Sequence, residues 1–269
     1  MRSRVLVSVV GVPLILLIIL WAPIQVMVIA LALLSAIAAF ELMRCVGVVK
    51  SLRESCVLSN VAILGALCTV FLLYKYEDYY ASLVVFYTLL IFSYAVYRAG
   101  AVKFQQIMAA LFAMFAVPYA FAAFLRLHEM GLHRAYLLLP LLFSFCSDTF
   151  AFFVGRTMGK HKLAPKVSPH KTVEGAVGGL IGNAVGAVVF ALIMNLGFNE
   201  GLDYPGIVVL GIFCSVVAQL GDLSFSLIKR EFGIKDYGHI FLEHGGVLDR
   251  FDSVIFVAPV LSAMMPLLL

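Results

Sequence analysis

The chain has 269 residues, of which 63% are apolar and only 13% are charged. Soluble globular proteins average about 25% charged and about 45–50% apolar residues, so this composition excludes an ordinary soluble domain. The apolar residues gather in long blocks, as in proteins that cross a bilayer repeatedly. The net charge is only +4, and the basic residues lie beside the apolar blocks, so nucleic-acid binding is not expected.

Nine blocks are long enough for a membrane-spanning helix, which needs about 20 mostly apolar residues. The first follows the basic start Met1-Arg-Ser-Arg and continues into the second without a cleavage-type exit, so we interpret it as a retained span. The two meet at residues 21–23, where a single re-entrant element would reduce the count to eight. The expected fold is therefore all-α and polytopic. The blocks are residues 5–22, 24–42, 57–74, 80–97, 106–125, 135–154, 174–196, 206–228 and 251–268.

Lys and Arg accumulate in cytoplasmic loops, and their distribution predicts the orientation. With the N-terminus in the cytoplasm, the outer loops hold only Lys75, Arg126 and Arg134 of the 19 Lys and Arg residues. The two longest inner loops, residues 155–173 and 229–250, are basic and contain glycine. We therefore expect an integral membrane protein with a functional site that faces the cytoplasm.

On the basis of these predicted spans and loops, we divide the chain into three parts. Residues 1–103 form the first four transmembrane helices. Residues 104–134 form the fifth helix and its connecting loop, a candidate dimer contact. Residues 135–269 form the last four helices and the two long cytoplasmic loops, where the polar residues concentrate.

Ionisable residues within a span cost about 2.5–3.5 kcal/mol on insertion scales, so each is a candidate functional residue. In block 206–228, polar residues recur at spacings of four and three, which places them on one helical face. A carboxylate at the depth of Asp222 needs a cation or a water-filled cleft. Ser215 and Gln219 alternatively form a polar seam between packed helices. The stripe comprises Ser215, Gln219, Asp222, Ser226 and Lys229.

Further carboxylates lie near the cytoplasmic ends of neighbouring spans. Asp249 and Asp252 are three residues apart and share a helical face, where their charges repel unless a cation intervenes. Mg²⁺ typically takes one or two carboxylates and completes its shell with phosphates and water, so a metal held by Asp222 and Asp249 is geometrically reasonable. Asp148 either faces the same cleft or pairs with a cation of a neighbouring helix.

Two other carboxylates have simpler explanations. Glu41 lies near the inner end of its span, where pairing with Arg44 at i+3 is the simplest interpretation. Glu174 falls in the first turn of a helix that Thr172 is expected to cap, where the helix dipole favours negative charge. A structural role and a catalytic-site role remain equally open for Glu174.

Small residues recur on one face of block 174–196, which lets helices approach closely. We assign this face to helix packing and not to substrate. It comprises Gly175, Gly179, Gly182 and Gly186.

The two long inner loops are candidates for binding phosphate. The five cations of residues 155–173 either reflect topology alone or form an anion site for a triphosphate or a lipid phosphate. The loop has no phosphate-binding Walker pattern. In residues 229–250, Gly245 and Gly246 allow close approach of the backbone to a ligand, and amides near the start of the last span are suited to phosphate oxygens. His239 and His244 lack helical metal-ligand spacing, so a histidine metal site is not expected.

Two composite motifs resemble those of phosphatidate cytidylyltransferases (CDP-diglyceride synthases). The first runs from Asp148 through Gly155-Arg-x-x-Gly-Lys-x-Lys-Leu-x-Pro-x-x-Ser-Pro-x-Lys-Thr-x-Glu-Gly175. The second is Ser226-x-x-Lys-Arg-x(4)-Lys-Asp-x-Gly-x-x-Phe-x-x-His-Gly-Gly-x-x-Asp-Arg-x-Asp252. Together they cover about two-fifths of the chain, whereas the first 130 residues match in hydrophobic character alone.

The resemblance implies that CTP and phosphatidic acid are converted to CDP-diacylglycerol and pyrophosphate, in the synthesis of phospholipids. It also implies dependence on Mg²⁺, assisted by a monovalent cation such as K⁺, and a homodimer. By the same resemblance Asp222 and Asp249 hold the metal, and Asp148, Glu174 and Asp252 complete the catalytic site. The residues expected to bind substrate are Arg156, Lys160, Lys162, Ser168, Lys171, Ser226, Lys229, Arg230, Lys235, Asp236, His244, Gly245, Gly246 and Arg250.

Two other functions fit some of these features. A CTP-dependent polyprenol or phytol kinase would use similar carboxylates and cations, but it would yield a lipid phosphate and CDP. An ion-coupled transporter would also place carboxylates within the membrane, although the inverted repeat found in many such folds is not evident in the sequence.

Overall fold

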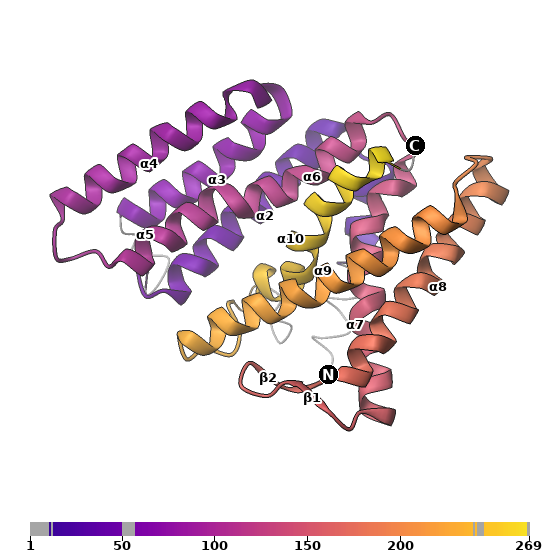
Figure 1. Ribbon diagram of the computed structural model, residues 1–269. Coiled ribbons are helices and arrows are strands. Elements are labelled where there is room, and N and C mark those ends of the chain that lie inside the picture. The colour runs from indigo at the N-terminus through magenta and orange to yellow at the C-terminus, as the bar shows by residue number, and fades with distance from the viewer. Residues whose placement is uncertain (1–10, 12, 50–56, 239, 241–244, 268–269) are drawn as a thin grey trace. The chain divides into compact units, whose positions relative to one another are not determined.

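The computed structural model describes residues 11, 13–49, 57–238, 240 and 245–267, and these are predominantly helical (Figure 1). The chain divides into two compact units. The first contains Met1–Arg134 and Glu231–Phe251, and the second contains Ala135–Arg230 and Asp252–Leu269. The earlier division of the chain at residues 103 and 134 stays a prediction.

Helices build the first unit. The described part begins with helical residues 13–20, which end in a turn before Pro23, the N-cap of the next helix. The expected break at residues 21–23 is therefore confirmed. Arg134 stabilises this break, because its guanidinium donates to the carbonyl oxygens of Leu20 (3.4 Å) and Ala22 (2.7 Å). The elements are α2 (Ile24–Cys45), α3 (Val57–Lys75), η1 (Glu77–Tyr79), α4 (Tyr80–Tyr97), α5 (Phe104–Leu111), η2 (Phe112–Ala116) and α6 (Val117–Glu129).

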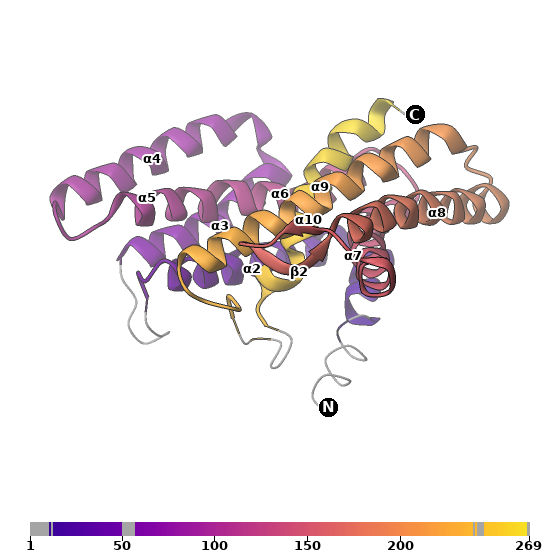
Figure 2. The same cartoon turned by 60° about the horizontal axis from the view of Figure 1, so that its bottom comes forward.

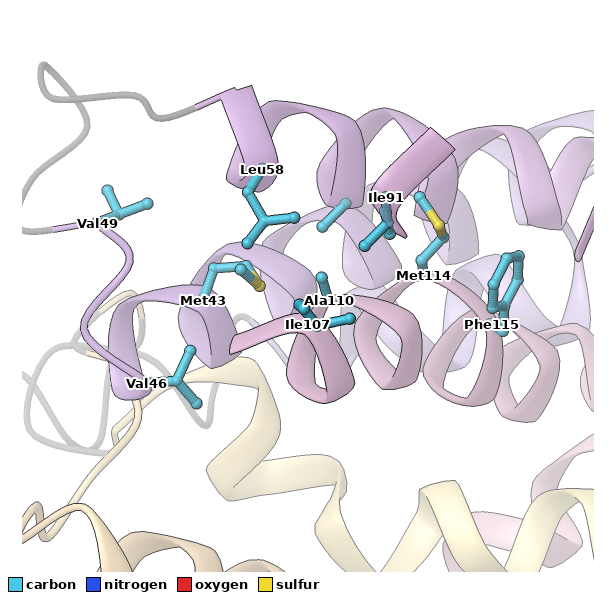
Figure 3. Close-up of a cluster of buried hydrophobic side chains, with 10 residues drawn as sticks. Met43, Val46, Val49, Leu58, Ile91, Ile107, Ala110, Met114 and Phe115 are labelled. Carbon is cyan, nitrogen blue, oxygen red and sulfur yellow. The ribbon is translucent and has the colours of Figure 1, made fainter. Parts of the chain in front are cut away.

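A cluster of buried apolar side chains joins α2, α3, α4 and α5 (Figure 3). Met43 of α2, Leu58 of α3 and Ile91 of α4 contribute to it, together with Ile107 and Met114 from the α5–η2 segment. All five side chains are less than one-tenth exposed. This cluster fixes α2 against the remaining helices of the first unit.

Pro118 explains an irregularity between α5 and α6. Proline lacks an amide hydrogen, so it cannot donate to the carbonyl four residues earlier, that of Met114. The chain forms a short π-helix at Phe112–Ala116 just before it. Thr69 of α3 supplies the missing donor, because its hydroxyl lies 2.9 Å from the Met114 carbonyl oxygen. α3 and η2 are thereby joined at a buried polar contact.

In the second unit, two long helices, α7 and α8, pack against each other, and a β-hairpin connects them in the chain (Figures 1 and 2). The hairpin is antiparallel, with Lys162 opposite Thr172 and Ala164 opposite Ser168. The sequence indicated only a rigid basic loop between these helices. In the structure, backbone hydrogen bonds between its two strands make part of this loop a β-hairpin. The remaining elements are η3 (Arg134–Leu138), α7 (Leu139–Met158), β1 (Lys162–Ala164), β2 (Ser168–Thr172), α8 (Val173–Phe198), α9 (Tyr204–Glu231), α10 (Val247–Met264) and η5 (Met265–Leu267). The first turn of α10, up to Phe251, is part of the first unit, and the rest of α10 is part of the second.

Glycines allow α7 and α8 to pack closely, as predicted from their spacing. A methyl group on Gly175 would lie 2.7 Å from the carbonyl oxygen of Ala151, and one on Gly182 would lie 2.3 Å from the Phe150 ring. Gly179 and Gly186 likewise face side chains of α7. The packing role assigned to this face is confirmed.

Seven helices of the described part are long and apolar enough to cross a bilayer, and each corresponds to a predicted block. The first predicted block, residues 5–22, is described at residue 11 and from residue 13 on, with residues 13–20 helical, so its full length stays a prediction. The last corresponds to α10, which carries the charges of Asp249, Arg250 and Asp252. The chain is thus a polytopic all-α membrane protein, while the count of nine and the orientation stay predictions.

Candidate functional site

Asp222 of α9 is the centre of a polar cluster within the second unit. Its carboxylate forms an ion pair with Lys171, which β2 supplies. The hydroxyl of Ser226, one turn further along α9, donates to Asp222 at 3.2 Å. The predicted helical stripe therefore brings Asp222 and Ser226 together, and the hairpin adds the cation that a carboxylate at this depth requires.

Two more carboxylates lie near Asp222. The negative charges of Asp148, on α7, and Asp252, on α10, interact with each other and with that of Asp222. The Ser253 side chain forms a hydrogen bond with Asp148, and the Ser253 amide donates to Asp252 at 2.7 Å. Lys229 of α9 acts electrostatically on Asp252. Three carboxylates thus share two lysines, and a further cation would relieve their mutual repulsion.

Ser253 and Gly221 were not anticipated from the sequence. A methyl group on Gly221 would lie 2.8 Å from the carbonyl oxygen of Asp252. Gly221 therefore allows α9 to approach α10 closely enough for Asp222 and Asp252 to interact. The position of Gly221 directly before Asp222 could have indicated its role. The role of Ser253 could not be predicted from residue spacing, because it depends on which helix packs against α10.

The N-terminal part of the polar stripe on α9, Ser215 and Gln219, has a different role from Asp222. The Ser215 hydroxyl lies 2.8 Å from that of Ser147 on α7. Gln219 donates to the Ala176 carbonyl oxygen on α8 at 3.1 Å and to Ser215 at 3.3 Å. The polar-seam interpretation thus holds for Ser215 and Gln219.

Glu174 anchors the hairpin. Thr172 caps α8 by accepting a hydrogen bond from the Gly175 amide at 3.1 Å, as predicted. The Glu174 carboxylate accepts from the amides of Lys160 (3.0 Å) and His161 (3.2 Å), and it contacts the His161 ring at 2.6 Å. These contacts favour the structural interpretation of Glu174, since they tie the α7–β1 connection to the first turn of α8.

Most of the remaining predicted phosphate ligands of the second unit surround this hairpin. Arg156, Lys160 and Lys162 are exposed, and Ser168 lies at the start of β2. The Arg230 guanidinium reaches the Val167 carbonyl oxygen at 3.4 Å, which links the end of α9 to the turn of the hairpin. The contacts of this surface with phosphate stay a prediction.

Asp249 belongs to the first unit, so its pairing with Asp222 stays a prediction. Its carboxylate accepts hydrogen bonds from the amides of Tyr237 (2.7 Å) and Gly246 (2.9 Å). Gly245 has a φ of 84°, a left-handed conformation that glycine adopts without strain. Lys235, Asp236 and Arg250 are exposed residues of the same unit. His239 and His244 lie outside the described residues.

Arg44 acts electrostatically on Glu41, as suggested, but the hydrogen bonds of Glu41 are formed with residues far away in the chain. The two carboxylate oxygens of Glu41 accept from the amides of Val247 (3.0 Å) and Leu248 (2.9 Å). Arg44 donates to the Tyr237 carbonyl oxygen at 2.8 Å. Amides in the first turn of α10 have no acceptor within their own helix, and they supply the Glu41 carboxylate with two donors.

In the part of the chain that the structure describes, no three His, Cys, Asp or Glu side chains are arranged to hold a metal ion. The oxygen donors of the second unit nevertheless fit Mg²⁺, which usually takes one or two carboxylates and completes its shell with phosphate and water. A metal that arrives with a nucleotide fits this donor set.

The fold and this cluster define a polytopic membrane protein with intramembrane carboxylates beside a basic hairpin. A model of the cytidylyltransferase family matches residues 2–268. The chain belongs to the cytidylyltransferase family.

Three curated relatives are bacterial proteins named phosphatidate cytidylyltransferase. The chain is 37% identical to the one from Staphylococcus saprophyticus over 179 residues. It is 35% identical to that of Staphylococcus haemolyticus and 34% identical to that of Staphylococcus aureus, each over 176 residues. Each match covers 65% of this chain and 65% of the relative.

Proposed function

We propose that the protein transfers the cytidylyl group of CTP to phosphatidic acid, forming CDP-diacylglycerol and pyrophosphate. The observation that carries the proposal is the cluster of Asp148, Asp222 and Asp252 with Lys171 and Lys229, which lies within the region matched by the family model. The relatives named phosphatidate cytidylyltransferase indicate the substrate pair.

The reaction requires little from a catalytic base. The nucleophile is a lipid phosphate oxygen that is already anionic, and it attacks the α-phosphorus of CTP as the bond to the pyrophosphate oxygen breaks. The chief task is to bring two polyanions together and to stabilise the charge that develops on pyrophosphate. The exposed cations of the hairpin and of α9 suit this task, and Lys171 is already held in place by Asp222.

Asp222 is the residue of the second unit that we propose as a Mg²⁺ ligand, with phosphate oxygens of CTP in the remaining positions. When bound, the metal would neutralise phosphate charge during the displacement. Lys171 would then be released from Asp222 to a phosphate group. The assistance of K⁺ and the homodimer stay predictions from the resemblance.

The distribution of Lys and Arg supports a cytoplasmic N-terminus. We propose that the hairpin and its cluster face the cytoplasm, where CTP is available, in the plasma membrane of a bacterium. Single cysteines at the exposed positions of Lys160 and Lys162 would test this. They should react with an impermeant thiol reagent in inside-out vesicles and stay unreactive in intact cells; the reverse pattern would overturn the orientation.

The activity itself is tested with purified protein in detergent, CTP carrying a labelled cytidine, and phosphatidic acid, with Mg²⁺ or with a chelator. We expect a labelled CDP-lipid and an equal amount of pyrophosphate only in the presence of Mg²⁺. If phosphatidic acid is inert and a polyprenol or phytol yields a lipid phosphate and CDP, the protein is a lipid kinase. If ion transport into liposomes occurs with no turnover of CTP, it is a transporter.

A further inference from the structure

Glu41, in the last turns of α2, is a buried carboxylate of a membrane protein, with 1% of its surface exposed. Such a group is costly unless it is well paired. Its two oxygens accept from the first two amides of α10, those of Val247 and Leu248. These amides have no partner within their own helix, and the helix dipole favours negative charge at this end. Glu41 therefore acts as the N-terminal cap of a helix about 206 residues away in the chain.

The surrounding backbone is shaped to receive this carboxylate. A methyl group on Gly238 or on Gly246 would lie 2.2 Å from the Glu41 carboxylate. Both glycines are buried. The glycines of this segment are therefore required by Glu41, in addition to any approach of a ligand.

Arg44, one turn after Glu41 on α2, holds the other side of the same segment. Its guanidinium donates to the Tyr237 carbonyl oxygen at 2.8 Å, and the Tyr237 amide donates to Asp249 at 2.7 Å. Asp249 also accepts from the Gly246 amide, directly before the amides that Glu41 binds. Two side chains of α2 thus hold the two backbone segments that orient Asp249.

We propose that Glu41 and Arg44 are positioning residues for Asp249, so that α2 sets the orientation of a carboxylate of the active site. The inference rests on the proposed function and on the role of metal ligand that the family resemblance implies for Asp249. It gives the N-terminal part of the chain a specific part in the reaction. Residues that orient a metal ligand typically change metal affinity by about 10- to 100-fold when they are altered.

The first test compares Glu41→Gln with Ser35→Ala. Gln keeps the shape and one acceptor but loses the charge and the second acceptor. Ser35 is equally buried on α2, but its hydroxyl donates only to Leu31 of its own helix. We expect Glu41→Gln to raise the Mg²⁺ concentration for half-maximal activity about tenfold and to speed hydrogen exchange of residues 245–251, with Ser35→Ala changing neither. The half-maximal concentration does not depend on the fraction of protein that is folded, so a merely structural role would leave it unchanged.

The second test uses Gly246→Ala in two backgrounds. In the wild-type protein the new methyl group must displace Glu41, so it should raise the half-maximal Mg²⁺ concentration and speed exchange at the start of α10. In a Glu41→Ala background the same substitution should add much less, because the two residues act as a unit. Equal added effects in both backgrounds would overturn the proposal.

Hydrogen exchange separates the inference from the function on which it rests. Unchanged exchange of residues 245–251 in both Glu41→Gln and Glu41→Ala would refute the role of Glu41, whatever the activity. A wild-type protein that forms no CDP-lipid would refute the proposed function, while faster exchange in Glu41→Gln would still establish that Glu41 holds this segment.

Discussion

Lys171 and Asp222 form an ion pair that joins the β-hairpin to α9. Both side chains are about one-quarter exposed, so the pair is accessible from outside the second unit. The like charges of Asp148 and Asp252 lie nearby. Lys171 is thus the cation that pairs with Asp222 and holds it in place before any substrate binds.

Removal of this cation should impair the reaction strongly. For Lys171→Ala we expect kcat/KM for CTP to fall about 10²-fold, the size typical of losing one donor to developing charge. Lys171→Arg, which keeps the charge, should recover part of this loss. Steady-state kinetics in detergent check the prediction, and wild-type turnover by Lys171→Ala would contradict it.

The Asp222 carboxylate should be essential for turnover but not for folding. Asp222→Asn keeps the shape of the side chain and can still accept from Ser226, so the protein should be purified in normal yield without activity. Ser224→Ala is the control, because the Ser224 hydroxyl donates only to the Leu220 carbonyl oxygen of its own helix. A CTP-plus-phosphatidate assay of both variants decides the matter. Substantial turnover by Asp222→Asn would remove Asp222 from the proposed metal site.

Asp249→Asn should likewise abolish activity. The Tyr237 and Gly246 amides both donate to one Asp249 oxygen, Oδ2. The carbonyl oxygen of Asn could still accept from both, but it is neutral, so the two hydrogen bonds should weaken. We expect both lost turnover and faster hydrogen exchange around residue 246. Retained turnover in this variant would show that Asp249 has no part in catalysis.

The contributions of the Glu174 and His161 side chains to holding the hairpin can be distinguished, because only Glu174 binds backbone amides. Glu174→Ala removes the acceptor of the Lys160 and His161 amides, so the hairpin should become sensitive to trypsin at Lys160 and Lys162. His161→Ala removes only the ring contact and should have a smaller effect. Limited proteolysis in detergent measures this difference. Equal sensitivity of the two variants would mean that the amide contacts do not hold the hairpin.

The glycine face of α8 predicts a matched pair of stability effects. A methyl group on Gly182 would overlap the Phe150 ring, so Gly182→Ala should destabilise the protein by about 1–3 kcal/mol. Gly197 has no atom within 4 Å of an added methyl group, so Gly197→Ala should be neutral or stabilising by up to about 1 kcal/mol. Thermal unfolding in detergent compares the two. A larger loss for Gly197→Ala would contradict the packing assignment.

The sequence by itself determined the features that depend on local periodicity. Runs of apolar residues predicted the helices, and glycine spacing predicted that one face of block 174–196 serves close helix packing. The four- and three-residue spacing placed Asp222 beside Ser226, and Thr172 was recognised as a cap because a helix start has unpaired amides close by in the chain. Each of these relationships spans at most a few helical turns.

Only the tertiary structure decided which distant groups satisfy one another. Glu41 has a nearby cation in the sequence, yet it binds the amides of Val247 and Leu248. Thr69 pairs with a carbonyl that Pro118 leaves without its usual donor, and Lys171 reaches Asp222 from a hairpin that the sequence showed only as a basic loop. The physical reason is the same in each case. A buried polar group takes the partner that helix packing brings within hydrogen-bonding distance, and this packing is not encoded in the spacing of neighbouring residues.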